Sequence, residues 1–372
     1  MNSFKDLSLP EALQSTLSAM NYSVPTPIQA KAIPIAMAGR DLVGCAQTGT
    51  GKTAAFCVPM ICSLIKTPAK TALILAPTRE LAMQIEEVFK KLTARHQDLK
   101  IALLIGGASM GSQFRALRNR PRVIVATPGR LNDHLRQRSV TLDSVGILVL
   151  DEADRMLDMG FAPQLNQILK FVPKNRQTLL FSATMPSDIQ QLAMRYMQNP
   201  ERVTIGTVSQ PAVTIDQSVV QTTQATKNNV LIDEVTSRDG SILIFARTKR
   251  RTDRLARFLY DSGHKVSRIH GDRTQKQRND AIDGFKHGKF RILVATDIAA
   301  RGIDISHIAH VINYDLPAVA EDYIHRIGRT GRAGAEGKAL SFVTPEEKPL
   351  WKDITRLLAK KNVSVNARTL QQ

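Results

Sequence analysis

The chain has 372 residues, 43% hydrophobic and 23% charged, which is the composition of an ordinary globular protein of about two domains. No run of about 18 apolar residues occurs, so the sequence predicts no membrane-spanning helix. The formal net charge is +18, with 24 Lys and Arg against 15 Asp and Glu in residues 1–206 and 27 against 18 in the remainder. A basic excess in both halves suits a polyanion that contacts both, although many basic proteins bind no nucleic acid.

The N-terminal sequence and the cysteines indicate the cellular compartment of the protein. No charged segment followed by an apolar one opens the chain, so the sequence predicts a cytoplasmic protein. Cys45, Cys57 and Cys62 fit a reducing compartment, and none has metal-ligand spacing to another. We therefore expect three small buried side chains rather than a disulfide or a metal site.

Short apolar runs, bounded by Gly, Pro, Asp or Thr, recur along the whole chain. In order they are 41–45, 72–76, 101–105, 123–126, 147–150, 178–181, 219–221, 242–245, 266–269, 292–295, 310–313 and 339–343. Near-continuous apolar runs of this length are typical of parallel strands buried on both faces. Helical patterns such as 79–92 and 250–261 lie between them, and another helix is expected at 350–361. The alternation predicts an α/β fold with a doubly wound parallel sheet, formed twice.

The domain boundary is predicted from a repeat and a polar segment. Residues 147–154 read I-L-V-L-D-E-A-D and residues 292–297 read I-L-V-A-T-D, which suggests duplicated domains. The polar segment 206–211 is the expected hinge. We predict an N-terminal domain over residues 1–206, a linker over 207–215 and a C-terminal domain over 216–372.

A phosphate-binding loop is predicted between the first strand and the helix that follows it. Its residues are Ala46, Gln47, Thr48, Gly49, Thr50, Gly51, Lys52 and Thr53, with Ala46 where the strict pattern has Gly. Glycines let the backbone N–H groups face a phosphate, and the helix N-terminus adds positive potential. Lys52 is predicted to hold the β- and γ-phosphates, and the Thr53 hydroxyl to ligate Mg²⁺.

An acidic group follows the run 147–150, at the strand edge where open α/β sheets bind ligands. There Asp151 can hold Mg²⁺ through its waters, and Glu152 can orient and deprotonate an attacking water. Acidic residues also favour helix starts, so Asp151, Glu152 and Asp154 taken alone fit a solvated helix start equally well. The upstream phosphate loop favours the catalytic interpretation.

In order and spacing, the motifs closely resemble those of the DEAD-box RNA helicases over essentially the whole chain. They comprise Phe4, Tyr22, 25–29, 46–53, 77–81, 106–107, 127–130, 151–154 and 182–184, then 244–248, 270–272, 296–297, 300–304 and 325–332. Asn21 departs from the family, which usually has Gly there. The resemblance implies two tandem RecA-like domains, ATP and Mg²⁺ as cofactors, and RNA-dependent ATP hydrolysis.

Gln29 is expected to recognise adenine, because its amide can donate to N7 and accept from the N6 amino group. Guanine presents acceptors at both O6 and N7, so we expect ATP to be preferred over GTP. A capped turn at 25–27 is the alternative; it explains the prolines but not the placement of Gln29. The resemblance adds Phe4 stacking on the base and, in the second half, Gly302 and Asp304 at the nucleotide, with Asp304 contacting the ribose.

Arg329 and Arg332 stand at i and i+3, so on one helical turn they can face the same way. Guanidinium groups spread charge over developing phosphate oxygens, and such fingers supply about 10³–10⁵ in rate. A solvated basic face is the alternative, but Gly328 and Gly331 indicate close approach of the backbone. Because the phosphate loop lies in the first half, hydrolysis is predicted to need both domains.

RNA contacts are expected where strands lead into helix N-termini, because such termini bind phosphates. Thr127 followed by Pro128 has the pattern of a capped helix start, and Thr78 and Gly107 also precede helical patterns. The positions that match the family's RNA contacts are Arg79, Gly107, Thr127, Arg130, His270, Gly271, Asp272, Thr296 and Arg301. The resemblance further implies that Ser182 and Thr184 hydrogen-bond Asp154, and that His325 contacts the acidic motif across a cleft.

Together these patterns predict an ATP-dependent RNA helicase that closes two domains on ATP and RNA and separates short duplexes locally, without translocation. Backbone contacts carry little base information, so binding should be independent of RNA sequence. One alternative is an ATP-dependent RNA clamp or annealing scaffold that unwinds little. Another is a DNA helicase or translocase, against which the Gln29 motif and the D-E-A-D tetrad argue. We expect a monomeric core with RNA-processing or ribosome-assembly partners.

Overall fold

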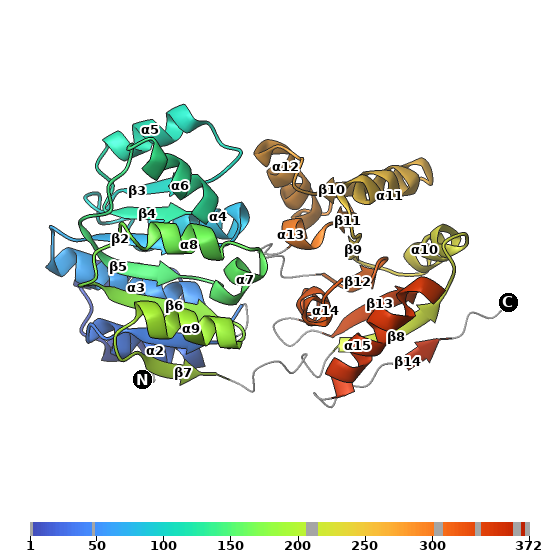
Figure 1. Ribbon diagram of the computed structural model, residues 1–372, viewed down its shortest axis with the longest axis horizontal. Helices are drawn as coiled ribbons and strands as arrows, with labels where there is room; N and C mark the ends of the chain where they lie inside the picture. The colour runs from blue at the N-terminus through green and yellow to red at the C-terminus, as the bar shows by residue number, and fades with distance from the viewer. Residues whose placement is uncertain are drawn as a thin grey trace. The chain divides into compact units, whose positions relative to one another are not determined.

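The computed structural model describes residues 3–46, 49–205, 215–300, 308–331, 336–359 and 366–368. The chain divides into two compact units, Met1–Val208 and Ser209–Gln372, each built around one parallel sheet (Figure 1). The expected hinge at 206–211 lies outside the described residues. No helix in the described ranges is long and apolar enough to cross a membrane.

In the first unit, the described strands form one sheet in the order β3-β4-β2-β5-β6-β1-β7, with parallel neighbours throughout. Its strands are β1 Leu42–Cys45, β2 Thr71–Leu75, β3 Ile101–Leu104, β4 Val123–Ala126, β5 Val145–Leu150, β6 Gln177–Ser182 and β7 Glu201–Thr204. Its helices are η1 Phe4–Asp6, α1 Glu11–Ala19, α2 Pro27–Met37, α3 Lys52–Lys66, α4 Arg79–Leu92, α5 Met110–Arg118, α6 Pro128–Arg136, α7 Ala153–Asp158, α8 Ala162–Ile168 and α9 Ser187–Tyr196.

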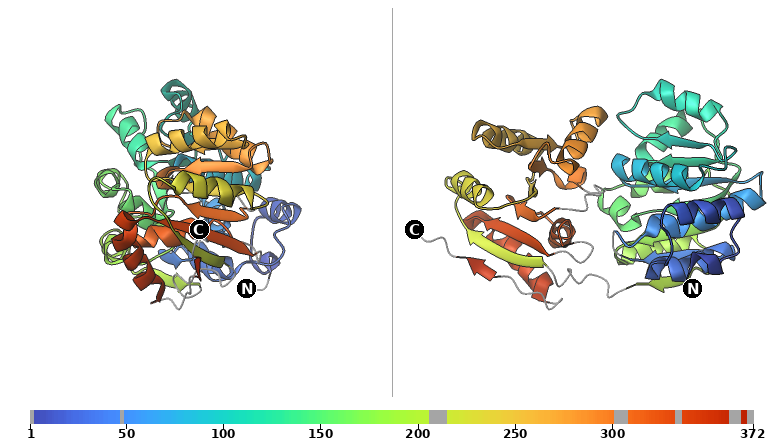
Figure 2. Two further views of the ribbon diagram at one scale, coloured as in Figure 1. Left: turned by 90° about the vertical axis from the view of Figure 1, so that its right-hand side faces the viewer. Right: turned by 180° about the vertical axis from the view of Figure 1, so that it is seen from behind.

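Helices cover both faces of this sheet (Figure 2). Successive strand residues point to opposite faces, so Leu42 packs in one core and Val43 in the other. The first core takes side chains from α1, α2, α3 and α4, and the second takes them from α6, α7, α8 and α9. Burial on both faces explains why the strands are apolar without alternation.

The second unit repeats this plan, with the strand order β10-β11-β9-β12-β13-β8-β14 and parallel neighbours. Its strands are β8 Ile215–Gln221, β9 Ile242–Phe245, β10 Val266–Ile269, β11 Ile292–Ala295, β12 His310–Asn313, β13 Gly337–Val343 and β14 Asn366–Arg368. Its helices are α10 Lys227–Thr236, α11 Lys249–Asp261, α12 Gln275–Lys286, α13 Asp297–Ala300, α14 Ala320–Ile327, η2 Pro345–Glu347 and α15 Lys348–Ala359.

The two strand orders are identical: when the strands are numbered along the chain, each position in the second sheet is the counterpart of the same position in the first. Thus β8 corresponds to β1, β9 to β2, β12 to β5 and β13 to β6. The expected duplication therefore holds for the described topology, but the short repeat did not align equivalent strands. Residues 147–150 belong to β5, whereas residues 292–295 are β11, the counterpart of β4.

Two strands were absent from the sequence prediction, and both lie at a sheet edge. Among the described strands, β7 pairs with β1 alone and β14 pairs with β8 alone. Along β7 only Val203 is buried, so the strand lacks the continuous apolar run by which the others were recognised. The expected runs 123–126, 242–245, 266–269, 292–295 and 310–313 are strands with those bounds.

Candidate nucleotide and nucleic-acid sites

The predicted phosphate loop joins β1 to α3 at the carboxyl edge of the first sheet. Gly49 and Gly51 have φ of 83° and 90°, a left-handed conformation that favours glycine, and Gly51 caps α3. Lys52, the first residue of α3, is 6% exposed, and its Nζ donates a 2.9 Å hydrogen bond to the Ala46 carbonyl. The ammonium group therefore lies back against the loop. Gln47 and Thr48 lie outside the described residues.

Gln29 ties the turn before α2 to this loop. Its Oε1 accepts from the Thr26 N–H at 2.9 Å, and its Nε2 donates to the Gly51 carbonyl at 3.0 Å. A Cβ on Gly51 would lie 2.3 Å from that Nε2, so this approach also requires glycine. Gln29 completes a capping box for α2. The expectation that a capped turn does not explain the placement of Gln29 is therefore wrong.

Phe4 is packed rather than presented to solvent. It is 3% exposed, belongs to the core of the first unit, and lies edge-to-face with Tyr22 at 5.8 Å between ring centroids. A ring in this position would have to be uncovered before it could stack on a base. Its stacking role stays a prediction.

Asp151 and Glu152 follow β5, at the same edge as the phosphate loop. Burial raises the pKa of the Asp151 carboxyl to about 7, although Lys52 opposes the rise and the carboxylates of Glu152 and Asp154 add to it. The Asp151 Oδ1 accepts from the Glu152 N–H at 3.0 Å. Glu152 has a φ of 51°, caps α7, and forms an ion pair with Arg155.

Asp154 is held by the segment that follows β6. Its Oδ2 accepts from the N–H groups of Ala183 and Thr184 at 3.0 and 2.8 Å and from the Thr184 hydroxyl at 2.8 Å. The expected contact from Ser182 is not the one formed, because the Ser182 hydroxyl donates to the Thr184 carbonyl at 2.6 Å. Beside Thr184, the residue that donates to the Asp154 Oδ2 is therefore Ala183, through its backbone N–H.

In the first unit, the expected RNA contacts gather at the carboxyl ends of β2, β3 and β4, which are neighbours in the sheet. Thr78 caps α4, and the Arg79 guanidinium lies over the turn at Gly107, where a Cβ would be 2.1 Å from its Nη1. The Arg130 Nη1 donates to the Ala108 carbonyl at 3.2 Å in the same loop. Thr127 is the N-cap residue of α6, which begins just beyond β4. The structure brings this half of the predicted set together.

In the second unit, His270, Gly271, Asp272 and Thr296 follow β10 and β11, the counterparts of β3 and β4. The His270 Nε2 lies 3.1 Å from the Asp253 Oδ1, and its buried Nδ1 has no hydrogen-bond partner within the described ranges. The Lys249 Nζ donates to the Asp272 Oδ1 at 2.5 Å, and this hydrogen bond lowers the pKa of Asp272. Arg301 lies outside the described residues.

Thr248 and Lys249 match Thr78 and Arg79; Thr248 lies within the motif 244–248 but was given no role there, and Lys249 was not recognised from the sequence. β9 is the counterpart of β2, and Thr248 caps α11 by accepting from the Arg251 N–H at 3.2 Å, as Thr78 accepts from the Leu81 N–H at 3.3 Å. The signal available was a Thr followed by a basic residue after the run 242–245, in register with the same pair after the run 72–76.

The backbone at Arg329 does not have the helical conformation that the sequence predicted. α14 ends at Ile327 and Gly328 caps it, so Arg329 lies beyond the helix, and the argument that i and i+3 share a helical face does not apply. Arg329 is 6% exposed, and His325, in the last turn of α14, is half-buried. Arg332, Gly302 and Asp304 lie outside the described residues.

Arg326 has a structural role that the sequence does not reveal, because several other arginines stand close to it. It is 2% exposed, and its Nε and Nη2 donate to the Asp297 carboxylate at 2.5 and 2.7 Å. Its Nη1 donates to the Asn313 Oδ1 at 3.1 Å and to the Asp315 carbonyl at 2.5 Å. Arg326 therefore ties α14 to the ends of β11 and β12.

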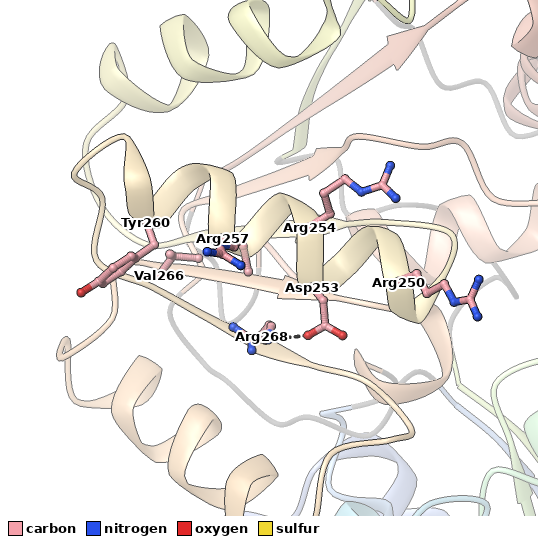
Figure 3. A pocket seen from close by; sticks show the side chains of 8 residues that line it. Arg250, Asp253, Arg254, Arg257, Tyr260, Val266 and Arg268 are labelled. Atoms are coloured by element: carbon pink, nitrogen blue, oxygen red, sulfur yellow. Dashed lines mark ion pairs between the residues drawn. The ribbon is translucent and has the colours of Figure 1, made fainter.

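A basic groove lies between α11 and β10 in the second unit (Figure 3). Arg250, Arg254 and Arg257 line it from the helix, and Arg268 lines it from the strand, where its Nε lies 2.5 Å from the Asp253 Oδ1. Tyr260 stands at its far end and is 70% exposed. The groove places positive charge along the helix whose start adjoins the His270 loop.

Comparisons with known proteins agree with this geometry. A family model described as DEAD/DEAH box helicase matches residues 26–192, and one described as Helicase conserved C-terminal domain matches residues 226–334. The ATP-dependent RNA helicase CshA of Listeria monocytogenes is 47% identical over 351 residues, which cover 93% of this chain and 67% of that protein.

Two solved structures match nearly the whole chain. S. cerevisiae Dbp5 bound to RNA and ADP BeF3 has a TM-score of 0.86 and 33% identity, and the match covers 99% of this chain and 96% of that one. Mss116p bound to ssRNA and AMP-PNP has a TM-score of 0.87 and 32% identity, with 99% and 79% covered. The two sheets are thus tandem RecA-like domains, and the chain belongs to the DEAD-box family of ATP-dependent RNA helicases.

Proposed function

We propose that the protein is an RNA-stimulated ATPase that separates short RNA duplexes locally. The proposal rests on one feature that the two sheets share and on one that only the first sheet has among the described residues. Both lead from three corresponding strand ends into helices, after β2, β3 and β4 and after β9, β10 and β11, and in both the helix after β2 or β9 begins with a capping threonine followed by a basic residue. In the described residues, a glycine-rich phosphate loop follows only β1. One strand of RNA can therefore use both units, whereas the nucleotide depends on the first.

ATP is the nucleotide that this loop suits. Lys52 would turn from the Ala46 carbonyl to the β- and γ-phosphates, which are stronger acceptors because they are charged. The Gln29 amide keeps one free N–H and one free lone pair after its contacts with Gly51 and Thr26. These can still match the N7 and N6 groups of adenine. The same pattern opposes guanine, so ATP should be preferred over GTP.

The residues present fit a magnesium ion beside the phosphates. No cluster of three or more His, Cys, Asp or Glu within the described ranges is placed to hold a metal alone. A magnesium ion is usually held by one or two carboxylates together with substrate phosphates and water. Asp151 is buried close to Glu152 and Asp154, and a cation would offset their mutual repulsion. Asp151 and the Thr53 hydroxyl would hold the ion, which would neutralise charge on the phosphates.

We assign Glu152 to the activation of water. It sits at the end of β5 with its carboxylate paired to Arg155, which fixes its direction. A carboxylate in that position can accept a proton from water as it attacks the terminal phosphate. We assign Arg329 and Arg332 to the charge that develops there, because a guanidinium distributes charge over several oxygens. Hydrolysis then requires the second unit, in which these arginines lie.

RNA and ATP are proposed to favour the same closed arrangement of the domains 1–206 and 216–372, linked through 207–215. Each ligand would then tighten binding of the other by the same factor. Thr184 and Asp154 would connect nucleotide state to this closure, with His325 contacting the acidic motif from the second domain. A bent single strand fits such an arrangement and a regular duplex does not. We further propose a cytoplasmic protein with a monomeric core and with RNA-processing or ribosome-assembly partners.

A strand-separation assay tests the proposal. A labelled RNA duplex of about ten base pairs is incubated with the protein and ATP, without ATP, and with the Lys52→Ala variant, and the product is resolved on a native gel. We expect release only with ATP and an intact Lys52. ATP-dependent RNA binding without release would favour the clamp, and equal activity on the matching DNA duplex would favour a DNA helicase.

A further inference from the structure

The second unit keeps the counterpart of the nucleotide site but fills it with its own side chains. Lys227 is the first residue of α10, which follows β8, just as Lys52 is the first residue of α3, which follows β1. Asp315 follows β12, the counterpart of β5, as Asp151 follows β5. Each of the two aspartates makes an equivalent backbone hydrogen bond within its own unit. Asp151 donates its N–H to the last residue of β2 at 3.0 Å, and Asp315 donates to the last residue of β9 at 3.2 Å.

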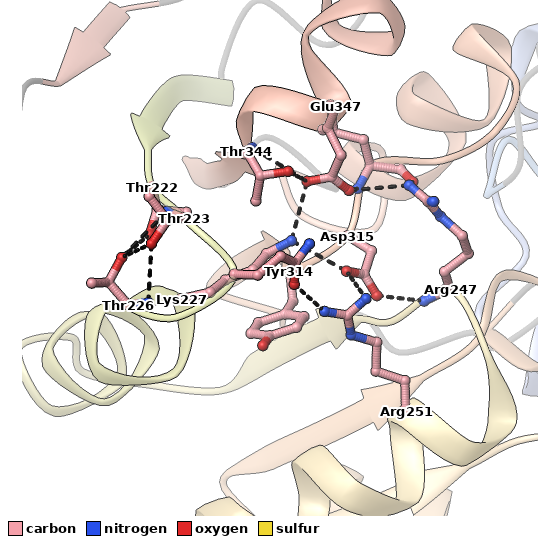
Figure 4. Close-up of polar contacts among 12 residues, drawn as sticks. Thr222, Thr223, Thr226, Lys227, Arg247, Arg251, Tyr314, Asp315, Thr344 and Glu347 are labelled. Atoms are coloured by element: carbon pink, nitrogen blue, oxygen red, sulfur yellow. Dashed lines mark hydrogen bonds and ion pairs between the residues drawn. The ribbon is translucent and has the colours of Figure 1, made fainter.

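The two lysines differ in their partners. Lys52 donates to a carbonyl of its own loop, whereas the Lys227 Nζ lies 3.2 Å from the Asp315 Oδ1 and 3.1 Å from the Glu347 Oε2 (Figure 4). The Lys227 side chain has no exposed surface, and its Nζ lies 4.8 Å from the centre of the Tyr314 ring. The cation of the second unit is therefore already neutralised and closed off from solvent.

Glu347 receives the donors that a bound phosphate would receive. Besides Lys227, its carboxylate accepts from the Arg247 Nη2 at 3.0 Å, from the Leu316 N–H at 3.2 Å, and from the N–H and hydroxyl of Thr344 at 3.4 Å. A lysine, an arginine, two backbone N–H groups and a threonine hydroxyl around one anion form the kind of donor set that holds a phosphate.

The same cluster fixes the start of α11. The Asp315 Oδ2 accepts from the Arg247 N–H at 3.0 Å, and the Arg251 Nη1 lies 3.2 Å from the Asp315 Oδ1. The Arg247 Nη2 also donates to the Leu316 carbonyl at 3.2 Å. Between these two anchored arginines stand Thr248 and Lys249, and Lys249 reaches Asp272 of the expected RNA loop.

We propose that Glu347 is a built-in anion that takes the place of a nucleotide phosphate in the second unit, and that Lys227, Asp315 and Glu347 are positioning residues that hold segment 247–251 ready for the RNA backbone. This inference rests on the proposed function, because it assigns a role in RNA binding. In the first unit the anion at the corresponding site would be supplied by ATP. In the second the anion is covalently part of the chain, so the RNA-facing segment is ordered without a nucleotide.

The test compares Glu347→Gln with Glu346→Gln, which removes the same charge from the adjacent exposed residue. ATP turnover of the full chain is titrated with single-stranded RNA. For Glu347→Gln we expect the half-saturating RNA concentration to rise about tenfold, the turnover at saturating RNA to stay near wild type, and RNA-free turnover to be unchanged. For Glu346→Gln the RNA dependence should match wild type.

Equal RNA dependence in the two folded variants would overturn the proposal. A loss of maximal turnover at an unchanged half-saturating RNA concentration would also overturn it, because that pattern reports lost active protein rather than mispositioned RNA contacts. If wild type itself shows no stimulation by RNA, the proposed function fails instead, so the two failures are distinguishable.

A second variant covers the case in which Glu347→Gln does not fold, since removing one partner of a buried ion pair leaves an unpaired charge. The double variant Lys227→Met with Glu347→Gln removes one cation and one anion, so the net charge of the cluster is kept. We expect it to fold, as judged by circular dichroism, and to show the same rise in half-saturating RNA concentration. A folded double variant with wild-type RNA dependence would contradict the positioning role.

Discussion

The Thr184 hydroxyl donates a 2.8 Å hydrogen bond to the Asp154 carboxylate and so joins the segment after β6 to α7. The same carboxylate oxygen accepts two backbone N–H groups, from Ala183 and from Thr184 itself. Three donors on one oxygen fix α7, which begins directly after Glu152, relative to β6. We therefore propose that a displacement of Glu152 by nucleotide is transmitted to the segment 182–184.

Thr184→Val should separate strand separation from nucleotide binding. The variant loses one of three hydrogen bonds to a charged acceptor, so we expect the free energy of unfolding of the first unit to fall by ~1.5–3 kcal/mol. ATP affinity should stay near wild type while strands released per ATP hydrolysed fall. Urea unfolding and the gel assay measure the two effects.

Ser182→Ala is the matched control for Thr184→Val, because the Ser182 hydroxyl donates to a neutral carbonyl instead of Asp154. Its expected cost is smaller, ~0.5–1.5 kcal/mol. Equal effects of the two substitutions would show that the hydrogen bond to Asp154 is not what matters.

Glu152→Gln should bind ATP and RNA but hydrolyse ATP slowly. The amide keeps the shape of the side chain yet cannot take a proton from water, and loss of a general base typically costs about 10²–10⁴ in rate. Single-turnover hydrolysis with saturating RNA measures the rate, and filter binding measures the RNA retained. A rate within threefold of wild type would reject Glu152 as the base.

The raised pKa of Asp151 should make the free energy of unfolding of the metal-free protein depend on pH. Its pKa is raised from 3.8 to about 7 by burial, so the folded state binds more protons than the unfolded state between these values. The free energy of unfolding of wild type, minus that of Asp151→Asn, should therefore fall as pH rises from about 4 to 7, by at most ~1.4 kcal/mol per pH unit, and level off above. Urea unfolding in chelator at several pH values measures this. A difference independent of pH would contradict the burial of an ionisable Asp151.

Gln29→Ala should affect both stability and nucleotide choice. The substitution removes the half of the α2 capping box that Gln29 supplies and the contact with the Gly51 carbonyl, and loss of a helix cap costs ~0.5–2 kcal/mol. If Gln29 also recognises adenine, the ratio of ATP to GTP turnover should fall toward one. A destabilised variant that keeps the wild-type nucleotide preference would leave Gln29 with the structural role alone.

The central strands and the chemistry at their ends could be predicted from the sequence because both leave local signals. A strand such as β9 is buried on both faces and is therefore continuously apolar, and the loop at 46–53 carries its glycines and lysine side by side. The edge strand β7 could not be found in this way, since only Val203 of its four residues is buried.

Contacts between distant residues left no such signal. Lys227 resembles any lysine at a helix start until β8 is seen to be the counterpart of β1, with Asp315 and Glu347 brought to it from about 90 and 120 residues away. The second contact of Gln29, with the Gly51 carbonyl, likewise depends on the fold. The end of α14 at Ile327 was missed because the Gly328 cap lies inside an arginine-rich run that fits a helix equally well.

The most direct test of the proposed mechanism is the steady-state rate of ATP hydrolysis by the full chain, measured with and without single-stranded RNA and with DNA of the same sequence. If the nucleotide cradle lies in the first unit and its completing arginines in the second, RNA should raise the rate at least tenfold, DNA should raise it little, and Arg332→Ala should abolish the stimulation while keeping ATP affinity. A rate that is already maximal without RNA, or one that RNA leaves unchanged, would contradict a divided active site that polynucleotide brings together.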